Sequence, residues 1–445
     1  MFKEVWKALW HSYLGKMGLG IFALFVFASF YVLITYPSNF GDEEWNNPVH
    51  WADNPKSVPP VWTAWFDSSK AKHLVRQVDD PVESRSLSDG TVLTRYEIPF
   101  SRSAGHPPSF ISVSIGEIEF SSFAPSIEVY LKDEDDELFI ASHRFFERVE
   151  GEGERVFRFM NEPFRIKVSS DERAKRQIER FFEGMHANGK SEFSLVLEAR
   201  MAEQDDSFGF VKAVVGGDVY GVLGTDTVGR NIWQGLVYGA PVALFIAITA
   251  SLLVVFIGTI LGGVSGYFGG AVDIVIQRFV DIVANVPLLP IMIFLIFVFG
   301  SRVEYVILII GLVGWTGLAI QLRPLTSHIK TSGFVDVLQA RGYTNSRILF
   351  RHVIPQTFPY ILAQFILAIP SAILTEAGIS FLGLGDASIP TWGQILQQGF
   401  NTGAQYLGYW WWIVPPGLAI SLMTLAFYLM STAIEHLTEP RMKGG

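Results

Sequence analysis

Long apolar runs constrain this 445-residue sequence more than any other feature. A helix needs about 20 apolar residues to cross the hydrocarbon core of a bilayer. We predict six such transmembrane helices, and hence a polytopic α-helical membrane protein. The expected spans are 17–37, 238–264, 279–300, 304–322, 358–376 and 410–433.

The first span could be taken for a secretory signal peptide, because three lysines precede it. The residues that follow it, Thr35, Tyr36 and Pro37, do not form the small-residue cleavage site of a signal peptide. We therefore predict an uncleaved first transmembrane helix after a cytoplasmic segment at residues 1–16.

Prolines interrupt two of the later runs. Pro287 and Pro290 lie inside the third run, where a membrane helix tolerates them if its neighbours satisfy the freed backbone groups. Pro370 and Glu376 interrupt the end of the fifth run. The third span is nevertheless expected to be one helix.

Lysine and arginine in the loops predict the orientation, since cytoplasmic loops are enriched in both. With six spans, the basic clusters all fall on one side of the membrane. Both termini are then cytoplasmic, and residues 38–217 lie outside. The basic residues used are Lys3, Lys7, Lys16, Arg323, Lys330, Arg341, Arg347, Arg351, Arg441 and Lys443.

Residues 38–217 have the composition of a soluble domain, with 32 acidic and 21 basic residues. This acidity argues against binding nucleic acid, and the absence of cysteine from the chain excludes disulfides and thiol catalysis. We predict a small β-sandwich with one helix at 170–183 that Gly184 ends. Residues 47–66 are expected to form a linker or an irregular wrap over the surface, and 133–137 a hairpin turn. The expected strands are 91–98, 110–120, 126–131, 155–160, 164–168 and 192–200.

Residues 184–191 match the phosphate-binding pattern G-x-x-x-x-G-K-[ST] letter by letter. That mechanism requires a strand, then the loop, then a helix whose N-terminal amides face the phosphates. Here a helix is expected before the loop and a strand after it. We interpret the segment as a helix end that turns into a strand, and we expect no ATPase site in this chain.

The basic loop between the fourth and fifth spans, 323–357, carries the most specific pattern. Residues 334–355 read FVDVLQARGYTNSRILFRHVIP and resemble the EAA loop of ABC importer permeases. Physically, a short helix over 336–341 that Gly342 stops would form a rigid lever between two spans. Val337 and Leu338 depart from the two alanines of the family pattern. The matching residues are Asp336, Ala340, Arg341, Gly342, Arg347, Phe350, Arg351, His352 and Pro355.

Three further segments are similar to the dipeptide and oligopeptide subfamily, and above all to its C-type permease. LGTDTVGRN at 223–231 precedes the second span, and LTEAGISFLGLG at 374–385 follows the fifth. The ending from Pro416 to Arg441 also fits. The resemblance is loose over 1–37 and close over 220–445, and it does not cover 38–217.

The resemblance implies a prokaryotic cell-membrane permease subunit of an ATP-driven importer, with a core at 218–445 and five of the spans. Its partners would be a second permease, two cytoplasmic ATPases that bind the ATP, and an extracytoplasmic substrate-binding protein. It would carry no cofactor or metal of its own and would not be an enzyme. Di- or oligopeptides are the implied cargo, with oligosaccharides as the alternative.

Charged and aromatic residues near the membrane allow narrower interpretations. Asp273, Arg278 and Asp281 have the spacing to pair with one another on one helix. Glu376 could face a translocation path or outer gate, or could brace the following loop. The tryptophans at 410–412 are expected to form an interfacial belt.

Two other functional classes remain open on the sequence. A membrane-anchored enzyme would place its catalytic site in 38–217, where no Ser-His-Asp set or metal-ligand spacing is evident. A sensor would bind its ligand there and signal through the cytoplasmic loop. We also expect the outer domain to dock or orient a binding protein.

Overall fold

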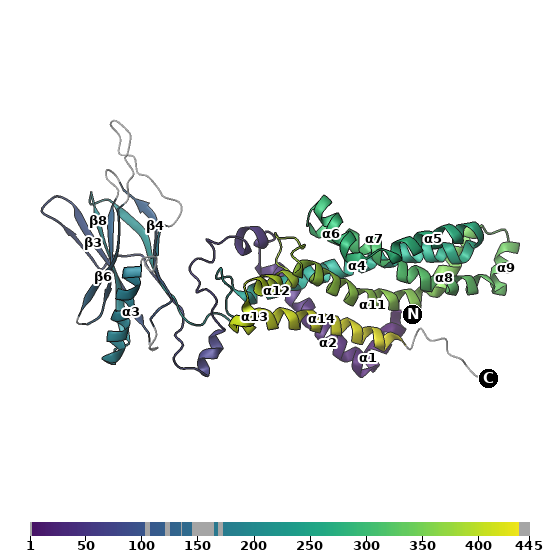
Figure 1. Cartoon of the computed structure of the whole chain (residues 1–445), viewed down its shortest axis with the longest axis horizontal. Coiled ribbons are helices and arrows are strands. Elements are labelled where there is room, and N and C mark those ends of the chain that lie inside the picture. Colours follow the sequence, from purple (N-terminus) through teal and green to yellow (C-terminus); the bar gives the residue numbers. More distant parts are fainter. Residues whose placement is uncertain are drawn as a thin grey trace, which may run out of the picture. The chain divides into compact units, whose positions relative to one another are not determined.

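The computed structural model describes residues 2–102, 107–120, 125–134, 136–144, 164–167 and 172–435. The chain divides into two compact units (Figure 1). The helical unit comprises 1–47 and 234–445, and the β unit comprises 48–233. Both divisions lie further along the chain than residues 38 and 217. One reason is that Trp45 contacts Gly235 and Asn46 donates a hydrogen bond to the Ala387 carbonyl, all within the helical unit.

The helical unit follows the apolar runs of the sequence. Among the described residues, five helical stretches are long and apolar enough to cross a membrane, and a bent pair of helices counts as a sixth span if it is taken as one. The long helices begin and end as follows: α2 Tyr13–Thr35, α4 Ile232–Phe268, α7 Val303–Gly314 continued by α8 Thr316–Lys330, α11 Ile354–Phe381 and α14 Trp410–Glu435.

The third predicted span is not one helix. It is divided between α5 (Gly270–Asn285) and α6 (Leu288–Phe299), which meet at a bend of 88°. Pro287 lacks an N–H and disfavours helical geometry at Val286, whose backbone is extended. By contrast, Pro370 lies inside the continuous helix α11, so the interruption expected there is absent.

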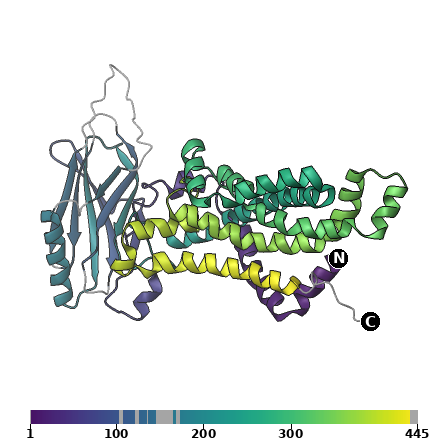
Figure 2. The ribbon, with the colours of Figure 1, turned by 45° about the vertical axis from the view of Figure 1, so that its right-hand side comes forward.

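Short helices complete the unit, and they precede, separate or follow the long ones (Figures 1 and 2). A π-helical turn at Gly41–Trp45 follows α2, and another at Leu349–Val353 leads into α11. The remaining short helices are α1 Phe2–His11, α9 Gly333–Ala340, α10 Asn345–Ile348, α12 Trp392–Asn401 and α13 Ala404–Leu407.

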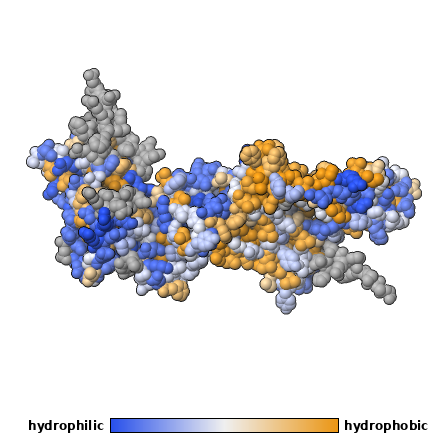
Figure 3. All heavy atoms as spheres, in the orientation of Figure 1, coloured by the Kyte–Doolittle hydropathy of each residue, from blue (hydrophilic) through white to orange (hydrophobic). Residues whose placement is uncertain are grey.

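The core of this unit joins buried side chains of α2, α4, α7, α11, α12 and α14. Figure 3 shows apolar residues gathered over the middle of the helices and more hydrophilic residues at the end that carries α9. The predicted tryptophan belt is wrong for two of its three members. Trp411 is buried, and Trp412, only 1% exposed, packs near Gly399 of α12, while Trp410 stays exposed. The packing of α12 on α14 explains the difference.

The β unit is a sandwich of two antiparallel sheets with one helix, α3 (Glu172–Ala187) (Figures 1 and 2). One sheet has the order β1-β9-β4-β7 and the other β2-β3-β8-β5-β6. The core lies between them, and apolar residues of α3 complete it. The strands are β1 Leu74–Val78, β2 Glu83–Ser86, β3 Val92–Ser101, β4 Ile111–Glu119, β5 Ser126–Lys132, β6 Glu137–Arg144, β7 Phe164–Lys167, β8 Glu192–Met201 and β9 Ser207–Val215.

The predicted strands at 91–98, 110–120, 126–131, 164–168 and 192–200 correspond to β3, β4, β5, β7 and β8. The predicted strand 155–160 lies outside the described residues, and β1, β2 and β9 were not predicted. Gly184 does not end α3, which continues to Ala187. The helix ends where Gly189 takes a positive φ of 70°.

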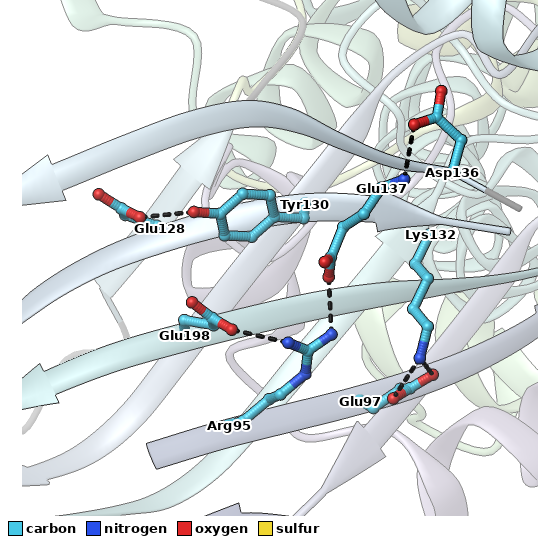
Figure 4. Close-up of polar contacts among 8 residues, drawn as sticks. All are labelled: Arg95, Glu97, Glu128, Tyr130, Lys132, Asp136, Glu137 and Glu198. Carbon is cyan, nitrogen blue, oxygen red and sulfur yellow. Dashed lines mark hydrogen bonds and ion pairs between the residues drawn. The ribbon is translucent and has the colours of Figure 1, made fainter. Parts of the chain in front are cut away.

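Charged side chains cover the outer face of the five-stranded sheet (Figure 4). Arg95 donates to Glu198 at 2.7 Å and to Glu137 at 2.6 Å, so it joins β3 to β8 and β6. Lys132 donates to Glu97 at 3.1 Å. These partly exposed pairs contribute little to stability individually, but they leave the face polar.

The two chain segments that border the sandwich are hydrogen-bonded to each other. Residues 57–61 and 220–226 are joined by backbone bonds such as Ser57 N–H to Asp226 O at 2.8 Å and Tyr220 N–H to Pro59 O at 2.9 Å. The predicted linker 47–66 is therefore an ordered part of the β unit, apart from Asn47, which belongs to the helical unit.

Candidate functional site

The short helix α9 lies between two long membrane-spanning helices, α8 and α11, and a glycine ends it. Gly342 has φ +80°. Its N–H bonds to Gln339 O at 2.9 Å, and the Tyr343 N–H bonds back to Leu338 O at 3.2 Å. This pair of bonds is the Schellman arrangement, which an L-residue with a side chain adopts only with strain. The predicted helix stop at Gly342 is confirmed.

A small apolar cluster holds α9 in place. Val335 of α9 is buried together with Tyr267, Ile348, Leu349 and Val353. Tyr267 belongs to α4, and its hydroxyl lies 3.3 Å from the Asn345 side-chain oxygen. The cluster joins α9, the end of α4 and the start of α11. A force on α9 would therefore be transmitted to those helices by packed side chains.

The other face of α9 is open. Asp336, Ala340 and Arg341 are exposed, and the Val337 side chain is 54% exposed. Leu338 is half-buried, since it packs against the apolar cluster. An apolar residue surrounded by exposed polar neighbours on a short helix is suited to docking in a groove of a partner.

The remaining residues predicted for this loop lie after Gly342. Arg347 of α10 is exposed, and its guanidinium lies 4.7 Å from the centroid of the Tyr343 ring, a cation–π contact. Pro355 is the second residue of α11 and is exposed. Between them lies the π-helical turn Leu349–Val353. Such turns are frequent at functional sites, where they mark a local change in helix geometry.

A groove opens among α4, α7, α8 and α11, with a volume of about 430 Å³. Its polar side chains are Gln321, Gln364, Ser371 and Thr375, and its other lining residues are aliphatic or glycine. Tyr360 donates a hydrogen bond to Gln321 and accepts one from Gln364 at 3.3 Å. The groove therefore presents amides and hydroxyls, which can exchange hydrogen bonds with water or a polar solute.

Glu376 does not line this groove, although it follows Thr375 directly. Its side chain lies on a neighbouring face of α11, about 100° around the helix from Thr375, and is 5% exposed. The Ser380 hydroxyl donates to its carboxyl at 2.7 Å. Ser380 in turn lies against Gly393 of α12. The side chain thus lies in the contact between α11 and α12, as expected of a residue that braces the loop between them.

Sequence reasoning missed the polar residues of the groove. Tyr360, Gln364, Ser371 and Thr375 recur at helical spacing along one side of α11, within an otherwise apolar run. A stripe of amides and hydroxyls at positions i, i+4, i+11 and i+15 was the available signal. The sequence prediction for the path named the carboxylate of Glu376 instead.

Asp273 pairs across helices rather than along its own. Its carboxylate accepts two hydrogen bonds from Arg323 of α8, at 2.7 and 2.5 Å, and one from Ser265 of α4 at 2.5 Å. Arg278 instead lies 3.7 Å from Asp281 on the exposed side of α5. The expected pairing of Asp273 with Arg278 is wrong, because the two positions face different sides of α5.

A closed turn precedes α4. The buried Asp226 carboxylate accepts backbone N–H bonds from Val228, Gly229 and Arg230 at 2.8 to 2.9 Å. The Arg230 side chain donates to the same carboxylate at 2.5 Å. The turn satisfies the carboxylate and positions Ile232, where α4 begins.

The segment that matches the phosphate-binding pattern has the order helix, turn, strand. The Gly189 N–H bonds to His186 O at 3.0 Å, and the Lys190 N–H bonds to Met185 O at 2.9 Å. The Lys190 ammonium lies 3.7 Å from Asp133. The interpretation as a helix end is confirmed, since these backbone groups close the helix and do not face an anion site.

Comparisons with known proteins define the class of this membrane chain. Residues 258–444 match the family described as "Binding-protein-dependent transport system inner membrane component". The dipeptide transport system permease protein DppC of Bacillus subtilis is 32% identical over 222 residues, which are 50% of this chain and 69% of that protein. The chain therefore belongs to this family of transport permeases.

Other relatives assign the chain to the dipeptide and oligopeptide permeases within this family. The oligopeptide permease protein OppC of Haemophilus influenzae is 29% identical, over 54% of this chain and 76% of its own. OppC of Bacillus subtilis is 32% identical, over 50% and 72%. A solved chain of the inward-facing MetNI methionine ABC transporter has a TM-score of 0.37 and 16% identity, over 46% of this chain and 95% of that chain.

Proposed function

We propose that this chain is one of two permease subunits of an ATP-driven importer in a prokaryotic cell membrane. The proposal rests on the way in which α9 is held in the structure. A Schellman stop and an apolar cluster hold the helix rigidly, and its outer face is left open. A rigid lever between two spans is what a cytoplasmic ATPase needs in order to move them.

The partners follow from this role. Two ATPases would bind the ATP, and α9 would dock on one of them through Val337 and its neighbours. The second permease would complete the path through the membrane, and a binding protein would deliver the cargo. The chain would carry no ATPase site of its own. This assembly is supported by the family match, whose description names binding-protein-dependent transport.

The groove among α4, α7, α8 and α11 is proposed as this subunit's wall of the translocation path. Its amides and hydroxyls suit peptide backbones, which offer the complementary donors and acceptors. The names of the relatives favour di- or oligopeptides as cargo. Oligosaccharides have similar hydrogen-bonding groups and remain the alternative cargo.

The β unit is proposed to lie outside the membrane, with both termini in the cytoplasm, and to dock the binding protein. Its charged outer sheet face, shown in Figure 4, offers partners for polar rim contacts. The alternative functions, a sensor or an enzyme in this unit, lack support from relatives, which are named as permeases.

The absence of cysteine makes the docking testable by cross-linking. A cysteine at Val337 should form a disulfide with a cysteine placed in the groove of a co-purified ATPase. A cysteine at the exposed Gln177 of α3 serves as the control. Failure of Val337→Cys to cross-link at any ATPase position, in a preparation that retains the ATPases, would contradict docking through α9.

The groove is tested by transport kinetics. Gln364→Leu removes the amide without a large change in volume, and it should raise the KM for peptide uptake by about 5-fold or more, as expected for one lost hydrogen bond. Leu367→Ile, on the same groove wall, is the matched control. An unchanged KM in Gln364→Leu would remove the groove from the path and leave the docking of α9 untouched.

A further inference from the structure

The first helix, α1, has two different faces. Val5 and Leu9, one helical turn apart, pack against the core of the helical unit, and Leu9 is buried. Trp6 and Trp10 project from another face and are 59% and 56% exposed. Their rings stack with centroids 6.1 Å apart. Two exposed indole rings side by side form an apolar surface that proteins seldom leave in contact with water.

A shallow pocket of about 240 Å³ lies between these indoles and two basic side chains. Trp6, Lys7, Trp10 and His11 line it. The His11 Nδ1 atom lies 2.8 Å from the Lys7 carbonyl, so the histidine ring is held against the helix end. The pocket combines apolar walls with a cation, a combination that suits an anionic group attached to an apolar body.

Along the chain, the pocket residues are followed directly by the apolar first span, α2. Beyond His11, exposed apolar residues continue onto α2 at Tyr13, which is 86% exposed, and at Leu14 and Met17. The Lys16 ammonium lies 5.8 Å from the centroid of the Tyr13 ring. The sequence of residues 1–20 contains three lysines and one acidic residue, Glu4, so its net charge is positive. The α1 face therefore lies at the level where a membrane span ends.

We propose that α1 lies in the headgroup layer of the membrane and that the Trp6–Lys7–Trp10–His11 pocket binds the phosphate of an anionic phospholipid. Tryptophan and tyrosine favour the membrane interface, where the ring is apolar and the N–H or O–H meets water. Lysine adds attraction to anionic lipid. The exposed apolar residues of α2 that follow, such as Tyr13 and Met17, are expected to contact lipid. A protein partner on α1 would have to displace that lipid, so we favour lipid as the ligand.

The depth of α1 is measured with single cysteines in the full chain, reconstituted in lipid nanodiscs. A nitroxide at Trp6→Cys should be accessible to oxygen and to an aqueous nickel complex at intermediate levels. Phe27→Cys, exposed in the middle of α2, sets the lipid limit, and Gln177→Cys of α3 sets the aqueous limit. A Trp6 label with the accessibility of Gln177 overturns the proposal. So does a label that is shielded only when ATPase is added, because that result assigns the face to a protein.

Lipid selectivity is measured by the phosphatidylglycerol retained from nanodiscs of mixed phosphatidylcholine and phosphatidylglycerol. Lys7→Gln should reduce the retained anionic lipid about 5-fold, the effect expected from one interfacial charge. Lys175→Gln, exposed on α3, should leave it unchanged. Equal retention in both variants overturns the phosphate site, even where the depth measurement places α1 in the interface. Neither measurement depends on transport activity.

Discussion

At the scale of single residues, backbone conformation and burial determine the role of a residue more than its type does. Gly342 matters because its φ of +80° closes α9, with open space where a side chain would begin. A glutamate in water is charged at neutral pH, yet the Glu376 side chain is buried against α12 and does not line the groove. The sequence predicts the first of these roles, because a glycine after a helical run is a local signal. It cannot predict which side of a buried helix a carboxylate faces, because that depends on packing partners distant in sequence.

Gly342→Val should uncouple ATP hydrolysis from uptake while the complex still assembles. A β-branched residue at this positive φ costs about 1–2 kcal/mol, enough to shift or fray the end of α9. ATPase activity and uptake are measured together in proteoliposomes. The uptake per ATP hydrolysed in Gly342→Asn should lie between that of Gly342→Val and that of the unsubstituted chain, since asparagine tolerates this conformation.

Gly333→Ala provides the control for that variant. Gly333 begins α9 with no neighbouring atom in the way and no positive φ, so alanine there should leave coupling unchanged. Normal uptake per ATP hydrolysed in Gly342→Val would contradict the role of α9 as a lever.

His73 should make the β unit sensitive to acid. Burial lowers the pKa of His73 to about 4; Asp53 raises it by a smaller amount, and Lys212 lowers it further. Both ring nitrogens are buried without a hydrogen-bond partner among the described residues, beside the rings of Phe110 and Tyr220. The unfolded chain therefore binds the proton more readily. Stability is lost as pH falls from about 6.5 to about 4, by at most about 3 kcal/mol.

The measurement is hydrogen exchange of the β1 and β9 peptides in the full chain, corrected for intrinsic rates at each pH. His73→Phe keeps the aromatic packing and removes the titrating group. This variant should reduce the acid-induced loss of protection. An identical pH dependence in both proteins would assign the acid sensitivity to other groups.

At the scale of elements, a stripe of glycines on α4 explains how closely it packs on α8. Gly258, Gly262 and Gly266 are four residues apart. A Cβ at each would lie 2.2 to 2.9 Å from atoms of α8 or of the residue before it. Small residues at this spacing let two membrane helices approach closely. Sequence patterns identified most elements, but β2 carries no apolar residue and is exposed throughout, so no alternation marked it as a strand.

Gly262→Ala should destabilise the helical unit by about 1–3 kcal/mol, the usual cost of overpacking. Its Cβ would lie 2.8 Å from the Ala319 carbonyl oxygen, and backbone atoms of α8 cannot yield cheaply. Thermal denaturation in detergent measures the change. Gly263→Ala is the matched control, because its Cβ would meet only the ends of two side chains, Ile354 at 3.3 Å and Leu349 at 3.9 Å. Equal melting temperatures in the two variants would contradict the close contact.

At the scale of the whole molecule, each compact unit has its own core, and the two cores share no residue. Composition separates the units clearly, since one is apolar and the other acidic. The exact boundaries were less predictable, because residues 38–47 and 218–233 both lie between an apolar span and the acidic segment but belong to different units. The orientation of the termini stays a prediction from loop charges.

Separate cores predict separate unfolding. In the double variant His73→Phe, Gly262→Ala, the change in hydrogen-exchange protection of each unit should equal that of the corresponding single variant. Cross-effects larger than about 0.5 kcal/mol would show that the units stabilise one another.

The composition of the groove has a consequence for energy conservation. Among the residues that the structure describes, its lining side chains include no carboxylate, histidine or lysine. Amides and hydroxyls do not change their charge near neutral pH, so this wall offers no titrating side chain that could carry a proton in a charged form. Uptake past this wall would then not be coupled to the cell's proton gradient through a titrating side chain, which would leave ATP as its source of energy.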